Sequence, residues 1–118
     1  MRNIVVFGLI VFFISGCAKK NPPLLEIQNA KIALVKAKEA DASKLSSDSF
    51  DSAKKHYKEI KGYMDKEEFE DAKYSAQKAL IEARLSQSRA KNAKVQKEID
   101  KLNGEVNTIK KEFTVISE

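Results

Sequence analysis

Cysteine is nearly absent from this chain, since Cys17 is the only one in 118 residues. A lone thiol forms no internal disulfide and builds no cysteine-rich zinc or redox centre. The chain also has one histidine, no tryptophan, two prolines and four glycines. With 33% charged residues, this composition is typical of a protein of long helices without a large globular core.

Long apolar runs are also missing, with one short exception at the start. The eleven residues from Ile4 to Ile14 carry no charge and follow Arg2. A bilayer core requires roughly twenty apolar residues, so this run is too short to span it. A positive residue, a short apolar run and then small residues are the order of a secretory signal peptide. We therefore expect residues 1–16 to be a leader that is removed.

The string Ile14-Ser15-Gly16-Cys17 closes this leader and resembles the lipobox of bacterial lipoproteins. The resemblance implies cleavage between Gly16 and Cys17, diacylglycerol on the cysteine sulfur and often a further acyl chain (palmitate) on the new amine. Two or three acyl chains, at about 0.8 kcal/mol per buried CH₂, anchor a protein stably. The alternatives are a buried thiol after an uncleaved anchor helix and a conventional signal peptide cut nearby.

Residues 17–23 are expected to form a short tether. Lys19 and Lys20 would lie at the lipid headgroups, and Pro22-Pro23 sets an extended start for the first helix. In many Gram-negative bacteria an aspartate after the lipidated cysteine favours the inner membrane. Ala18 stands there, so the resemblance implies the outer membrane, facing the periplasm, in a Gram-negative host.

Residues 24–94 have the spacing of an alanine-rich helical hairpin. The first helix is predicted from Leu24 to about Leu45, where Ser46-Ser47-Asp48-Ser49 supplies residues that cap the second helix. Gly62 and Asp65 mark the end of the second helix, near Tyr63. The third begins at about Lys66, where acidic residues complement the helix dipole.

Three stripes predict how these helices pack, with small residues that allow close approach. They comprise Ala30, Ala33, Ala37 and Ala40 in the first helix; Phe50, Ala53, Tyr57, Ile60 and Met64 in the second; and Phe69, Ala72, Ala76, Ala79, Ala83, Ser86, Ala90 and Ala93 in the third. The fold class is therefore all-α: a helical hairpin or three-helix layer whose long third helix ends in a coiled-coil-like segment.

Residues 95–118 carry a different stripe, two residues out of step and so about 200° around the helix. We expect it to be a coiled-coil seam, because its apolar residues alternate at spacings of four and three. β-Branched residues mostly at position a favour a parallel dimer, in which Glu105 would pair with Lys110. The alternative is that the stripe folds back on the hairpin as core. The seam comprises Asn92, Val95, Ile99, Leu102, Val106, Ile109, Phe113 and Ile116.

No pattern of catalytic, metal-binding or nucleic-acid-binding residues is present. His56 lies among lysines, with no carboxylate expected to orient it. The acidic residues between Asp65 and Asp71 lack the glycine and the oxygen spacing of a calcium loop. Lysines alternate with acids and form no basic stripe. We expect a protein that is not an enzyme, with no metal, no cofactor beyond the lipid on Cys17, no nucleic acid and no small-molecule substrate.

The mature region resembles the bacterial lipoprotein family known as domain of unknown function 4398. The resemblance covers roughly Pro23 to Ala90 and implies a helical fold. It is carried by Pro23, the alanines of the first helix including Ala42, Phe50-x-x-Ala53, and Glu68-Phe69-Glu70-Asp71-Ala72 followed by Ala76, Ala79 and Ala83.

These observations predict a lipid-anchored, non-enzymatic envelope protein with a structural, scaffolding or self-association role. Its partners would be the membrane, through the anchor, and a second copy or another envelope protein. The alternative is an accessory binding subunit of an outer-membrane export or assembly complex.

Overall fold

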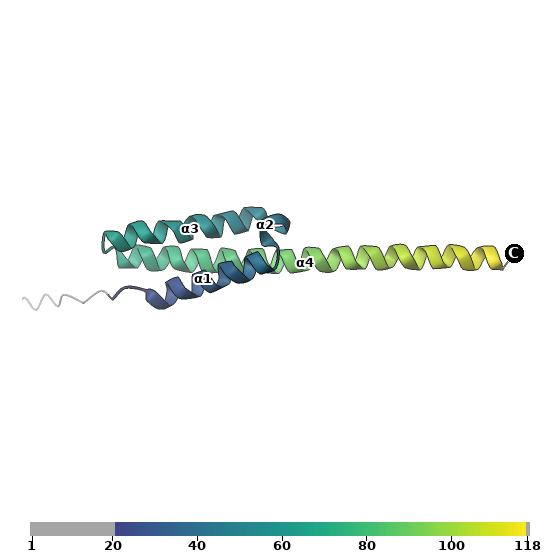
Figure 1. Ribbon diagram of the computed structural model, residues 1–118, viewed down its shortest axis with the longest axis horizontal. Helices are drawn as coiled ribbons and strands as arrows, with labels where there is room; N and C mark the ends of the chain where they lie inside the picture. The colour runs from purple at the N-terminus through teal and green to yellow at the C-terminus, as the bar shows by residue number, and fades with distance from the viewer. Residues whose placement is uncertain (1–20, 118) are drawn as a thin grey trace, which may run out of the picture.

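The computed structural model describes residues 21–117, which form four helices and no strand. These are α1 (Leu24–Glu39), the single turn α2 (Ala42–Leu45), α3 (Ser47–Asp65) and α4 (Phe69–Ile116). The helix α4 has 48 residues, about 72 Å at 1.5 Å per residue. Figure 1 shows α1 and α3 on either side of the first half of α4, whose second half extends beyond them alone. The all-α class with a long last helix is confirmed.

Alanine forms the contact between the three long helices. In α4 every residue of the predicted small-residue stripe from Ala72 to Ala90 is buried, and Phe69 and Ala93 are half-buried. Ala30, Ala33 and Ala37 of α1 and Phe50, Ala53 and Ile60 of α3 are buried against it. Small side chains at such contacts allow helix axes to approach closely. The stripes therefore predicted the packing faces.

The predicted first helix is wrong in one respect, because it ends at Glu39 and not at Leu45. Asp41 has left-handed backbone angles (φ 63°, ψ 28°) and its N–H bonds to the carbonyl of Lys38, which closes the helix. No glycine or proline signals this corner; aspartate is one of the few other residues that adopts this conformation readily. The chain then turns through α2 into α3.

The boundaries of the next two helices also differ from the prediction. The helix α3 continues through Gly62 to Asp65, and Ser46 at its start makes no side-chain capping bond. Glu67 has φ 59°, and the N–H groups of Glu67 and Glu68 bond to the carbonyls of Met64 and Tyr63. This is a Schellman motif, which delays α4 from Lys66 to Phe69.

Two ion pairs join α4 to the α1 side of the layer. Lys73 Nζ lies 3.9 Å from Glu26 Oε1, and Lys94 Nζ lies 2.5 Å from Asp41 Oδ2. Lys94 holds the corner between α1 and α2 near the end of the layer. Beyond it, α4 makes no contact with the other described helices that buries a side chain.

Candidate functional site

The expected lipid site at Cys17, and the cleavage position between Gly16 and Cys17, lie outside the described residues. The same is true of the leader 1–16 and of most of the tether. Within residues 21–117, no helix combines the length and the apolar character required to cross a membrane.

The predicted C-terminal seam lies on the second half of α4, where no side chain from Lys94 onward is buried by another described helix. Its apolar side chains are all exposed, from 44% at Ile99 to 81% at Ile116. Asn92, in the same register, is exposed too. The stripe does not fold back as core. Exposed large apolar side chains in a continuous row mark a surface for protein contact.

Sequence reasoning missed three further members of this surface, which lie in the first half of α4. Tyr74, Ile81 and Leu85 are exposed although α1 and α3 pack on the other side of the same turns. Ile81 is two residues from buried Ala83, about 200° around the helix. The signal was available: the a and d positions continue backward from Asn92 to Leu85, Ile81 and Tyr74. We call the row from Tyr74 to Ile116 the outer seam of α4.

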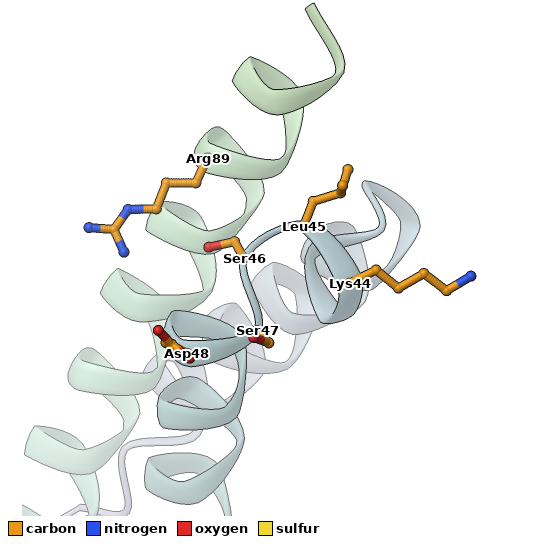
Figure 2. A pocket seen from close by; sticks show the side chains of 6 residues that line it. All are labelled: Lys44, Leu45, Ser46, Ser47, Asp48 and Arg89. Carbon is orange, nitrogen blue, oxygen red and sulfur yellow. The ribbon is translucent and has the colours of Figure 1, made fainter. Parts of the chain in front are cut away.

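A polar hollow of about 400 Å³ lies where α2 meets α3, beside α4. Figure 2 shows its lining: Lys44 and Leu45 come from α2, Ser46 joins α2 to α3, Ser47 and Asp48 begin α3, and Arg89 comes from α4. Arg89 Nη1 donates a 2.8 Å hydrogen bond to Ser49 Oγ, so the guanidinium ties α4 to α3. The lining contains no histidine, no cysteine and one carboxylate. Neither serine of this lining, Ser46 or Ser47, forms a hydrogen bond with its basic residues, Lys44 and Arg89.

His56 departs from the prediction, because a carboxylate does lie beside it. Its Nδ1 is 3.0 Å from Oε2 of Glu59, one turn along α3, and both side chains are partly buried. Residues three apart lie on one face of a helix, so this pair is local. Among the described residues, no three His, Cys, Asp or Glu side chains come together in a way that would hold a metal ion.

The corner at Asp41 holds a carboxyl whose pKa is lowered by its neighbours. The hydrogen bond from Lys94, and then the charge of its ammonium, hold the pKa of Asp41 below its ordinary value of 3.8. Lys44 adds a smaller effect of the same sign. Opposite charges favour the ionised carboxyl. This is a structural ion pair at an exposed corner.

The fold and the outer seam together define an all-helical protein. Its helices α1, α3 and the first half of α4 form a three-helix layer, and the second half of α4 extends beyond that layer. Residues 25–102 match the family described as domain of unknown function DUF4398, and the chain belongs to that family. The match includes the layer and the first part of the free helix; the last heptads of the seam lie beyond it. Comparisons with curated proteins and with solved structures gave no match.

Proposed function

We propose that this protein is a lipid-anchored, non-enzymatic scaffold of the bacterial envelope, which acts through the outer seam of α4. The observation that carries the proposal is the division of α4 into two faces. The alanine face is fully used by α1 and α3, whereas the outer seam exposes apolar side chains along the helix. Burial of apolar surface yields roughly 25 cal/mol per Å², so such a row gains by meeting a partner.

The anchor is proposed from the sequence. The positions of α1 and α4 agree with an anchored scaffold. Lipid on Cys17 would hold the chain a few residues before Pro23, where α1 begins beside the start of α4. The far end of α4 is then up to about 70 Å from the anchored end. We place the protein in the cell envelope, on the periplasmic side of the outer membrane in a Gram-negative host.

The anchor is tested by mass spectrometry of the mature N-terminus and by fractionation of envelopes. The wild-type chain should begin at Cys17 with added acyl mass, and Cys17→Ala should abolish both cleavage and lipid. Ala18→Asp should move the protein to the inner membrane, while Ala18→Ser, which adds no charge, should leave it in place. An unmodified N-terminus or a soluble wild-type chain would overturn the proposal.

A second candidate is an accessory subunit that binds an outer-membrane export or assembly complex. It is favoured by a second apolar surface on α1, where Leu25, Ile32 and Val35 are exposed on the side away from α4. Pull-down from detergent extracts separates the two candidates. A stoichiometric complex that Ile32→Asp disrupts would favour the accessory subunit, and recovery of this chain alone would favour the scaffold.

A further inference from the structure

The outer seam of α4 is one register from Tyr74 to Ile116, and not a short C-terminal patch. Position a recurs at Lys78, Leu85 and Asn92 before Ile99, and position d at Tyr74, Ile81 and Ser88 before Val95. The apolar members of the early half are 57%, 64% and 37% exposed at Tyr74, Ile81 and Leu85 respectively. A partner helix therefore finds the same face open beside the three-helix layer and beyond it.

The charges that flank this seam change sign halfway along. At successive g positions stand Arg84 and Lys91, then three glutamates, all exposed. At the e positions, Glu82 stands near one end and Lys110 near the other. The three glutamates are Glu98, Glu105 and Glu112.

The orientation of a partner helix decides whether these charges attract or repel. In a parallel pair, position g of one helix faces the following e of the other. Only Glu105 with Lys110 is then attractive, and Arg84 faces Arg89. In an antiparallel pair, g faces g and e faces e, so the basic half of one rim lies along the acidic half of the other. The row of charges at the g positions is therefore complementary to the same row on a second copy that runs in the opposite direction.

We propose that the outer seam binds a second copy of this chain in antiparallel orientation, centred near Lys97. In this register Arg84 lies opposite Glu112, Lys91 opposite Glu105, and Glu82 opposite Lys110, each twice by symmetry. The one like-charge contact is Glu98 with its own copy at the centre. Apolar layers form between Phe113 and Ile81, Leu85 and Ile109, and Ile99 and Val95.

This pairing covers the outer seam along both halves of α4. The free second half of each α4 becomes a fourth helix on the layer of the other copy, covering Ile81 and Leu85. The polar positions Lys78, Ser88 and Asn92 lie opposite Ile116, Val106 and Leu102, and they weaken other registers at some cost in stability. The two N-terminal ends lie at opposite ends of the pair, so two anchored copies would lie along the membrane surface. The inference rests on the proposed function, which assigns this seam to protein contact, and replaces the parallel pairing.

The association is tested with the chain from Ala18 onward, which contains all described residues and no cysteine. Sedimentation equilibrium should give a dimer at tens of micromolar. Arg84→Glu with Lys91→Glu should weaken it about tenfold or more, because attractive rim pairs become repulsive. A chain with Glu105→Lys and Glu112→Lys should weaken likewise, and an equimolar mixture of the two variants should restore the dimer. In a parallel pair Arg84→Glu would instead tighten association, which would overturn the proposal.

A distance measurement gives an independent test of orientation. A spin label on Lys111→Cys lies fourteen residues from the proposed centre in each copy. The antiparallel pair therefore separates the two labels by about 40 Å at 1.5 Å per residue, whereas a parallel pair holds them within about 20 Å, the width of two helices. A label on Lys97→Cys should give a short distance. Only monomer at tens of micromolar, or a short distance at Lys111, overturns the inference.

The outcomes distinguish this inference from the proposed function, because the tested chain has no anchor. Lipid on Cys17 with a monomeric soluble chain would leave the anchor in place and reject the pairing. Circular dichroism of each variant verifies that the exposed substitutions leave the helices folded.

Discussion

Two residues with left-handed backbones set the corners of this protein, and neither is a glycine. Asp41 ends α1 and Glu67 ends α3, with φ of 63° and 59°. A side chain in this conformation costs roughly 1–2 kcal/mol, which is why glycine is the usual choice after a helix. Asp41 also forms an ion pair with Lys94, whereas Glu67 forms no ion pair within residues 21–117.

Glu67→Gly should therefore stabilise the protein. We expect the free energy of unfolding to rise by about 1 kcal/mol, because glycine adopts this backbone without strain while the Schellman hydrogen bonds remain. Urea denaturation measures the change. Lys66→Gly, where φ is −97°, is the control and should give no gain. A lower stability for Glu67→Gly would show that the glutamate side chain itself supports the turn.

The Asp41–Lys94 pair should make the α1–α2 corner sensitive to acid. A carboxyl whose pKa is lowered on folding stabilises the fold above its ordinary pKa of 3.8, and that stabilisation is lost as the pH falls through the folded value. NMR titration of the Asp41 carboxyl in Lys94→Gln should show the pKa returning toward the ordinary value. Lys44→Gln should move it less, and an equal effect of both variants would contradict the assignment.

The helices α1 and α4 pack through faces of small residues, whereas α3 adds Phe50 and Ile60 to the core. On α4 that face serves α1 and α3 together, so the buried positions leave almost no room. Ala79 has no exposed surface and lies among Ala30, Ile60 and Ala76. The helix therefore depends on the smallness of its alanines and not on large apolar anchors.

Ala79→Leu should lower the free energy of unfolding by about 2–3 kcal/mol, because the added carbons force α1 or α3 away from α4. Gln77→Leu, on an exposed position of the same turn, should change it by less than about 0.5 kcal/mol. Thermal or urea unfolding of the two variants makes the comparison. Equal effects at both positions would mean that the layer is loosely packed.

At the scale of the whole molecule, half of α4 stands outside the layer that stabilises the rest. A single helix in water is marginally stable, and most helical stability comes from packing. The stability of the second half of α4 should therefore depend on whether a partner is bound to the outer seam. A partner on the seam would stabilise the free helix and the layer in one event.

Ile99→Asp should prevent association, and with it the gain in stability that association provides, without disturbing the three-helix layer. The wild-type midpoint of urea unfolding should rise between about 1 and 50 μM chain, as expected when association favours the folded state. In Ile99→Asp it should be independent of concentration and equal to the wild-type value at the low concentration. Asn107→Asp, which adds the same charge off the seam, should keep the wild-type behaviour. A wild-type midpoint independent of concentration would argue against self-association.

The sequence determined the helices and their faces, because a period of 3.6 residues places every third or fourth residue on one side. The stripes from Ala30 to Ala37 and from Ala72 to Ala90 were buried as predicted. The seam from Val95 to Ile116 was assigned to the opposite face of the same helix. These are local properties, readable from spacing alone.

Only the tertiary structure decided where the chain turns and how far the seam extends. At the break, Asp41 pairs with Lys94, a residue 53 positions away, and spacing within one segment does not predict such a partner. Whether Tyr74, Ile81 and Leu85 are core or surface depended on which side of α4 the helices α1 and α3 occupy. An apolar side chain becomes core only when another element covers it, and that is a property of the assembled fold.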